Sequence, residues 1–218
     1  MIIIRIRSTI TAVFEAENLM KIIIVGGTGT IGSAVVKELS PRHELIIVGH
    51  NHGDIKADIT DNASIENMYQ KAGKFDALIS TTGKVHFGPL SEFTAEQYNI
   101  GLKNKLMGQV NLVLIGLKYI QDAGSFTLTS GVLSHDPIRL GSSASMVNGA
   151  IDAFVKSAAI ELPRGIRINV VSPTVLTESL PHFGDYFRGF DSVPANRVAL
   201  AFSKSVEGAQ TGQVYRVL

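Results

Sequence analysis

The chain has 218 residues, of which 45% are hydrophobic, 18% charged and 7% aromatic, a composition that fits one globular domain. Twenty basic and nineteen acidic residues leave a net charge of +1, which argues against a broad basic surface for nucleic acid or for an anionic membrane. Cysteine is absent, which excludes disulfides, thiolate nucleophiles and thiolate-bound zinc.

The first 19 residues do not fit the pattern that follows them. An apolar run at residues 2–4 precedes Arg5 and Arg7, the reverse of the order in a secretory signal, and Met20 stands directly before the first expected strand. Two interpretations stay open: an extension that precedes a physiological start at Met20, or a loosely attached N-terminal strand. No apolar run reaches the roughly 18 residues of a membrane helix. We therefore expect a cytoplasmic protein with no membrane, nucleic-acid or metal ligand.

From residue 21 onward, apolar runs alternate with helical patterns, which is typical of βαβ units in a parallel sheet. The aliphatic run Lys21–Val25 ends in glycines and predicts a buried strand. The further strands are expected at residues 44–48, 54–57, 76–80, 125–130, 166–171 and 211–217. The helices are expected at residues 30–39, 61–71, 94–120 and 143–162, with a last short helix after the loop from Pro173 to Pro194. The pattern predicts one doubly wound, seven-stranded, mainly parallel α/β domain over residues 20–218.

A glycine-rich turn follows the first predicted strand and leads into the first helix. Its sequence is Gly26-Gly27-Thr28-Gly29-Thr30-Ile31-Gly32. Glycines let backbone N–H groups approach a pyrophosphate, and the N-terminus of the helix adds a partial positive charge. The position between a buried strand and a helix is more specific than the glycine pattern alone. We expect a dinucleotide site here, with a purely structural glycine turn as the alternative.

The residues after the second strand bear on which dinucleotide binds. NAD-selective sites place Asp or Glu there to take the ribose hydroxyls. In this chain the run is Gly49-His50-Asn51-His52, and the first acid is Asp54. With no carboxylate to repel it, a 2′-phosphate would fit beside His50 and Asn51, so NADP(H) is favoured over NAD(H). A polar loop without a role and a metal site at the two histidines are the alternatives.

Several segments together resemble the short-chain dehydrogenase/reductase family, and the resemblance covers residues 21–217. Ala57-Asp58-Ile59 is similar to the family's adenine-contacting segment, and Ser80-Thr81-Thr82-Gly83 stands where the family has Asn-Asn-Ala-Gly. Ile166–Pro173 looks like its sixth-strand signature, and Thr211–Val214 like its last strand. The resemblance implies a Rossmann-type fold and hydride transfer between a nicotinamide cofactor and a small carbonyl or alcohol. The expected cofactor-binding residues are Gly26, Thr28, Gly29, Thr30, Ile31, Gly32, His50, Asn51, Asp58, Ile59, Ser80, Thr81, Thr82, Gly83, Pro173 and Leu176.

The catalytic positions of the family are not matched. The family polarises a carbonyl with a serine hydroxyl and a tyrosine phenol, and a lysine four residues after the tyrosine lowers the pKa of that phenol. In the register fixed by Gly149-Ala150-Ile151, Ala144 stands in the tyrosine place and Asn148 in the lysine place. None of the five tyrosines is followed four residues later by a lysine, so no shift of register restores the motif.

Three residues remain as the expected catalytic group. Ser130 lies near the place of the family's serine, and Lys105 stands where the family has a helix asparagine. The lysine and the amide thus look exchanged between Lys105 and Asn148, so we expect Ser130, Lys105 and Asn148 at the site. The alternatives are a solvated helix lysine and a hydroxyl that only caps a strand. The further candidates for a proton donor are His86, His135 and Tyr186.

Two functions follow from this mixture of matched and unmatched positions. The first is an NADP(H)-dependent oxidoreductase with a non-standard catalytic site, acting on a small molecule. The second is a non-catalytic NADP(H)-binding protein or redox sensor, and a lyase or epimerase is a third, weaker alternative. The resemblance also implies a homodimer or homotetramer paired through the helices at residues 94–120 and 143–162. The small and apolar residues expected at that contact are Ala150, Ala153, Phe154, Ser157 and Ala158.

Overall fold

A single seven-stranded parallel sheet organises the protein. The computed structural model describes residues 19–218; the expected extension over residues 1–19 lies outside them except for Leu19. The strands are β1 (Lys21–Val25), β2 (Glu44–Gly49), β3 (Ile55–Lys56), β4 (Phe75–Ser80), β5 (Ile120–Thr129), β6 (Arg167–Pro173) and β7 (Val214–Val217). Their order is β3-β2-β1-β4-β5-β6-β7, and every pairing is parallel. The predicted doubly wound α/β fold is confirmed.

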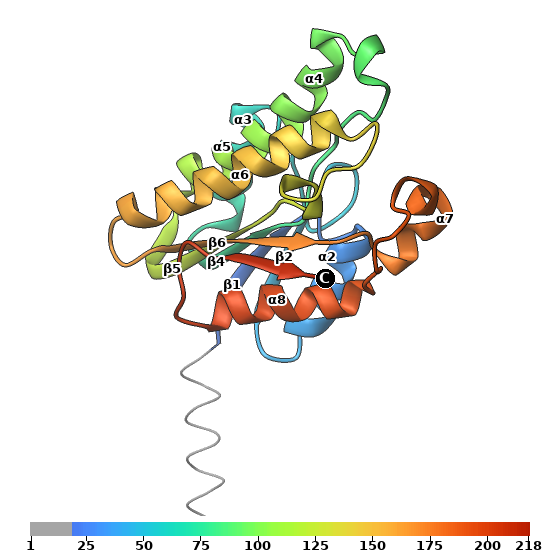
Figure 1. Ribbon diagram of the computed structural model, residues 1–218. Coiled ribbons are helices and arrows are strands. Elements are labelled where there is room, and N and C mark those ends of the chain that lie inside the picture. The colour runs from blue at the N-terminus through green and yellow to red at the C-terminus, as the bar shows by residue number, and fades with distance from the viewer. Residues whose placement is uncertain (1–18) are drawn as a thin grey trace, which may run out of the picture.

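Helices cover both faces of the sheet (Figure 1). They are α2 (Thr30–Leu39), α3 (Asn62–Ala72), α4 (Ala95–Gly101), α5 (Gly108–Gly116), α6 (Ser142–Glu161), α7 (Leu180–Phe183) and α8 (Ala195–Glu207). Side chains of a strand alternate between its two faces. Ile22 and Ile24 of β1 therefore pack in the core under α2 and α8, whereas Ile23 and Val25 pack in the core under α3, α5 and α6. Two covered faces explain why β1 is an uninterrupted aliphatic run.

The predicted helix over residues 94–120 is wrong in its continuity and in its end. The chain forms α4, then a π-helical segment (Leu102–Met107), then α5, and enters β5 at Ile120. In the π-helical segment the N–H of Gly108 donates to the carbonyl of Lys103, five residues back. The strand predicted at residues 125–130 begins early because Ile120 already pairs with Phe75, before a register shift in β4.

Three other predicted elements differ in extent. The strand predicted at residues 54–57 is reduced to β3, and that predicted at residues 211–217 is reduced to β7. The predicted loop from Pro173 to Pro194 contains α7 and two short 3₁₀ turns, Thr177–Ser179 and Gly184–Tyr186. These changes lie at the ends of the sheet and in its connections, so they leave the strand order intact.

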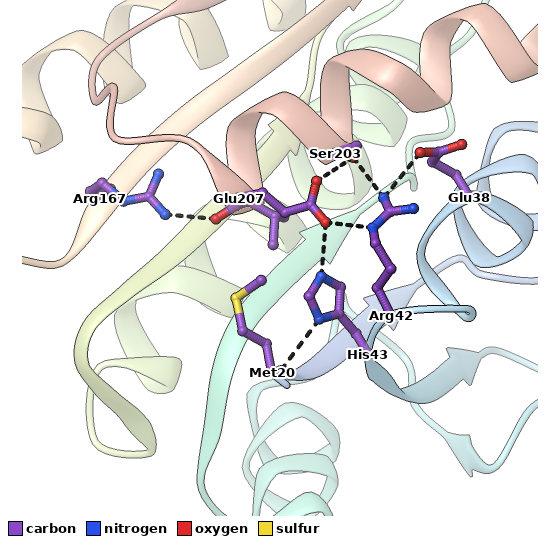
Figure 2. Close-up of polar contacts among 8 residues, drawn as sticks. Met20, Glu38, Arg42, His43, Arg167, Ser203 and Glu207 are labelled. Atoms are coloured by element: carbon purple, nitrogen blue, oxygen red, sulfur yellow. Dashed lines mark hydrogen bonds and ion pairs between the residues drawn. The ribbon is translucent and has the colours of Figure 1, made fainter. Parts of the chain in front are cut away.

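A polar cluster at the amino edge of the sheet connects the starts of β1 and β2 to the end of α8 (Figure 2). The carboxylate of Glu207 accepts hydrogen bonds from Arg42 Nε (2.8 Å), His43 Nε2 (3.0 Å) and Ser203 Oγ (2.7 Å). The backbone N–H of Met20 donates to His43 Nδ1 at 3.3 Å. Because a backbone N–H can only donate, Nδ1 must accept, and the ring proton lies on Nε2.

Candidate functional site

A cleft of about 380 Å³ opens at the carboxyl ends of β1 and β4. The strand order reverses between these two strands, which is the position where open α/β sheets bind ligands. Nine of the expected cofactor-binding residues line the cleft: Gly26, Thr28, Gly29, His50, Asp58, Ile59, Thr81, Thr82 and Gly83. The other seven lie outside this lining: Thr30, Ile31, Gly32, Asn51, Ser80, Pro173 and Leu176.

The glycine turn is shaped by close backbone approach. Gly26 has φ of 84°, and a Cβ there would lie 2.8 Å from Thr82 Cγ2 and 2.9 Å from Thr81 Oγ1. A Cβ at Gly32 would lie 2.1 Å from the carbonyl oxygen of Gly26, so Gly32 lets α2 pack onto the turn. Among the residues that the structure describes, no side chain caps the N-terminus of α2 at Gly29. The free N–H groups of its first turn therefore fit an anionic group such as a pyrophosphate.

The segment after β2 brings a histidine and no acid to the cleft. His50 lines it, whereas the side chain of Asp54 accepts a hydrogen bond from the N–H of Ile47 at 2.8 Å and closes the turn after β2. The acid that does line the cleft, Asp58, accepts from the N–H and the hydroxyl of Thr60 at 2.8 and 2.7 Å. These two hydrogen bonds lower the pKa of Asp58. The Asp58 carboxylate is therefore fixed by local hydrogen bonds to Thr60.

The carboxyl end of β4 forms the opposite wall of the cleft. The N–H of Thr81 donates to the carbonyl of Val25 at 2.8 Å, which extends the pairing of β1 and β4. Ser80 points inward: its hydroxyl bonds to Thr82 Oγ1 at 2.8 Å, and its carbonyl accepts from Thr129 Oγ1 at 2.6 Å. Ser80 therefore positions Thr82, which lines the cleft.

Beside this wall the structure brings together the three residues expected to be catalytic. The ammonium of Lys105 donates to the carbonyl of Ser130 at 3.0 Å, and Asn148 Nδ2 donates to the next carbonyl, that of Gly131, at 3.4 Å. The stem of Lys105 passes over Gly83, where a Cβ would lie 2.6 Å from Lys105 Cδ. The Lys105 side chain thus points into the site and is not a solvated helix lysine.

At this position Ser130 and Asn148 are buried, Lys105 is half-buried, and their polar groups are incompletely bonded. Burial lowers the pKa of Lys105 to about 8, and the negative charge of Asp152 acts in the opposite direction. Ser130 is 3% exposed, and its hydroxyl has no hydrogen-bond partner among the described residues. The Oδ1 atom of Asn148 is equally buried and unpartnered within residues 19–218. Buried polar atoms without partners are rare and point to a ligand or water contact.

A buried glutamine fixes the π-helical segment to the end of β5. Gln109 Nε2 donates to the carbonyls of Lys105 (3.0 Å) and Thr129 (2.9 Å), and its Oε1 accepts from the N–H of Thr129 (2.9 Å). The pairing of β4 with β5 ends at Thr127, so this amide supplies the partner that Thr129 lacks there. Our sequence reasoning missed Gln109 and Asp152. The only signal was their spacing, four residues after Lys105 and Asn148.

The remaining proton-donor candidates lie in loops. His86 packs on the ring of Phe93 with centroids 5.3 Å apart, His135 is exposed, and Tyr186 is 42% exposed. Over residues 19–218, no hydrogen bond joins any of these three to Lys105 or to Ser130. Ala144, in the tyrosine place, is buried at 3% exposure.

Two negative findings apply to the described part of the chain. In residues 19–218, no group of three histidine or acidic side chains is close enough to hold a metal ion. In the same range, no helix combines the length and the apolar character needed to cross a membrane.

Comparison with known sequences adds a family model and named relatives. A model described as enoyl-(acyl carrier protein) reductase matches residues 31–211. An uncharacterized oxidoreductase of Methylorubrum extorquens is 24% identical over 181 residues, which cover 72% of this chain and 73% of the relative. Versicolorin reductase 1 of Dothistroma septosporum is 27% identical over 185 residues, which cover 70% and 68%.

Comparison with solved structures gives the same fold over most of the chain. A protein from Listeria innocua superposes with a TM-score of 0.90 at 53% identity, covering 91% of this chain and all of its own. A small-chain dehydrogenase in complex with NADPH superposes with a TM-score of 0.81 at 26% identity. That match covers 91% of this chain and 96% of the dehydrogenase.

Proposed function

Because this chain belongs to the short-chain dehydrogenase/reductase family, we propose that it is an NADP(H)-dependent oxidoreductase with a non-standard catalytic site. Its reaction is hydride transfer to or from a small carbonyl or alcohol. The observation that carries the proposal is the cleft at the point where the strand order reverses, lined by the glycine turn and joined by Gly83 to Lys105. The NADPH complex of a similar dehydrogenase supports the choice of cofactor class.

In this proposal, different residues of the cleft would bind different parts of the dinucleotide. Gly26, Thr28 and Gly29 take the pyrophosphate at the N-terminus of α2, and Asp58 and Ile59 take the adenine. A 2′-phosphate would be held beside His50, because Asp54 is turned into the end of β2 and places no carboxylate in the cleft. When bound, the cofactor supplies or accepts a hydride at its nicotinamide ring.

The chain's own contribution to the reaction is made at the end of β5. The hydroxyl of Ser130 has no partner among the described residues and donates a hydrogen bond to the carbonyl oxygen of the substrate. Lys105 keeps one N–H on the carbonyl of Ser130, which leaves its other N–H groups for the substrate oxygen and the ribose. With a pKa near 8, Lys105 gives a proton to the developing alkoxide and regains one from water.

The test is turnover by purified protein. NADPH oxidation is followed with a panel of aldehydes and ketones, for the native chain and for Lys105→Met and Ser130→Ala. We expect turnover with at least one carbonyl and a loss on the order of 10²–10⁴-fold in Lys105→Met, the usual contribution of a general acid. Native activity in Lys105→Met would remove this lysine from the mechanism.

A second function is favoured by one observation, the buried Ala144 in the place of the family's tyrosine. A chain that keeps the cleft without a phenol would serve as a non-catalytic NADP(H)-binding protein or redox sensor. Tight binding of NADPH, together with no turnover across the carbonyl panel, would select this function over the first.

A further inference from the structure

Three polar residues form a stripe along one side of α6. Ser145, Asn148 and Asp152 are spaced three and four residues apart, the spacing of neighbours on one helix face. Each has a buried side-chain oxygen with no hydrogen-bond partner among residues 19–218: Ser145 Oγ, Asn148 Oδ1 and Asp152 Oδ1. We call these three residues the α6 stripe. Of the three, Asp152 is the one that carries a charge, and the proposed reaction gives it no role.

The α6 stripe lies beside the helix that carries Lys105. A Cβ at Gly101 would lie 3.2 Å from Ser143 Oγ and 3.3 Å from Val147 Cγ1, so α4 and α6 are in close contact. Lys105 follows Gly101 by one turn, and Asn148 and Lys105 bond to successive carbonyls after β5. Asp152, one turn beyond Asn148, therefore continues this side of α6 along the π-helical segment.

Asp152 of α6 is the charged residue whose field acts on Lys105. Of the bases on neighbouring segments, Lys84 lines the cleft after β4 and Lys103 is exposed on the π-helical segment itself. The end of β5 contributes Ser130, which does not titrate near neutrality. Asp152 is thus the acid that can offset burial of the ammonium, and its charge acts on Lys105 in the direction that keeps the proton bound.

We propose that Asp152 is a positioning residue for Lys105, whose carboxylate keeps the buried amine in its ammonium form. Without this charge, burial favours the neutral amine, which has no extra proton to donate and no charge to attract an anionic cofactor. Asp152 therefore sets the upper pH limit of the site. The expected effect of Asp152 on cofactor binding rests on the proposed function. Its effect on the protonation of Lys105 does not.

The first experiment measures the protonation of Lys105 without any cofactor. Lysine is labelled with ¹³C at Cε, the signal of Lys105 is assigned by its absence in Lys105→Met, and its midpoint is followed by NMR against pH. We expect a midpoint near 8 in the native chain and one about one pH unit lower in Asp152→Asn. Asp152→Glu, which retains the charge, should recover most of the difference.

The matched control is Glu161→Gln, the same acid-to-amide change at an exposed position of α6, and it should leave the midpoint unchanged. An unchanged midpoint in Asp152→Asn would overturn the proposal. If Asp152→Asn does not fold, Asp152→Ser removes the same charge with a smaller side chain and is held to the same expectation.

The second experiment links this charge to the cofactor. The dissociation constant of NADPH is measured against pH for the same variants. We expect affinity to fall above the midpoint of Lys105, and to fall at lower pH in Asp152→Asn, with about tenfold weaker binding between the two midpoints. Lys105→Met should abolish this dependence. A shifted NMR midpoint without any NADPH binding would reject the proposed function and keep Asp152 as the positioning residue.

Discussion

The position of the Lys105 side chain depends on a glycine, Gly83. Its aliphatic stem lies over Gly83 at the end of β4, and a Cβ at that position would come within 2.6 Å of Cδ and 2.7 Å of Cγ. Even the smallest addition therefore displaces the stem, and with it the ammonium that bonds to Ser130. The wall of the cleft and the lysine are coupled through this one contact.

Gly83→Ala should consequently weaken NADPH binding about tenfold or more, since overpacking a close contact costs roughly 1–3 kcal/mol. The measurement is a fluorescence titration with NADPH. The matched control is Gly149→Ala on α6, where an added Cβ meets no atom within 4 Å. Equal affinities for the two variants would mean that the stem of Lys105 moves aside freely.

His50 should determine the choice between the two dinucleotides. We expect the native chain to bind NADPH more tightly than NADH, because the two acids after β2 are engaged in their own turns, Asp54 with Ile47 and Asp58 with Thr60, and leave the ribose without a free carboxylate among residues 19–218. His50→Asp places one there, so NADPH affinity should fall by repulsion of the 2′-phosphate while NADH affinity is kept or improved. Calorimetric titration of both cofactors tests this, and the NADH titration is the internal control. A native preference for NADH would contradict the assignment.

At the scale of elements, the end of α8 is joined to β1 and β2 by the Glu207 carboxylate. Burial alone would raise the pKa of Glu207, but hydrogen bonds from Arg42, Ser203 and His43 outweigh burial and lower it. A folded-state pKa below the unfolded value gives stability that is present above the unfolded pKa and is lost as the pH falls through the folded pKa. The contribution of this carboxylate is therefore full at neutral pH and disappears in acid.

Glu207→Gln should lower the free energy of unfolding by about 1–2 kcal/mol at pH 7, the usual cost of disturbing charged hydrogen bonds at a partly exposed site. The difference from the native chain should shrink as the pH falls through the lowered pKa of Glu207, because both side chains are neutral below it. Denaturant unfolding at several pH values measures it. The control is Asp185→Asn, whose carboxylate is 90% exposed in its pair with Arg188 and should change stability by less than about 0.5 kcal/mol.

The order of elements could be predicted from the sequence because strands and helices each leave a period in the apolar residues. The break between α4 and α5 leaves no such signal in the sequence, since no proline or glycine pair interrupts residues 102–107. The π-helical segment is fixed instead by Gln109, which bonds to Thr129 of a strand that comes later in the chain. The early start of β5 likewise depends on its partner, Phe75.

The candidate site could likewise be predicted only in part from the sequence. The cleft could be predicted from neighbouring residues, because strand, glycines and helix are contiguous in the chain. The meeting of Lys105 and Asn148 could be anticipated only through the family resemblance, because the two residues lie on separate helices. Asp152 was missed, since a single acid on a helix gives no sign in the sequence of which residue it faces.

At the scale of the whole molecule, α5 and α6 expose three large apolar side chains. Leu114 is 53% exposed, Met146 42% and Ile160 87%. A depression of about 250 Å³ lies nearby and is lined in part by Leu117 and Phe154. Exposed apolar patches of this kind favour contact with another protein surface. We expect this surface to pair two copies of the chain, as the resemblance to the family implies.

Leu114→Glu should therefore reduce the mass measured by light scattering at micromolar concentration, from that of a dimer or tetramer toward that of a monomer, because a buried charge at such a contact has no partner. Leu90→Glu is the control, because Leu90 is 70% exposed and lies in the segment between β4 and α4. A native chain that is already monomeric would refute the expected assembly.

The cleft is lined entirely by residues from Val25 to Asn104, whereas Lys105, Ser130 and Asn148 all come later in the chain. The residues that bind the nucleotide and those that handle the proton therefore occupy successive parts of the sequence. A substitution on α6, such as one at Asp152, can therefore change proton handling without replacing any residue that lines the cleft. Proteins with this arrangement can change or lose their reaction during evolution and still keep the residues that line the nucleotide cleft.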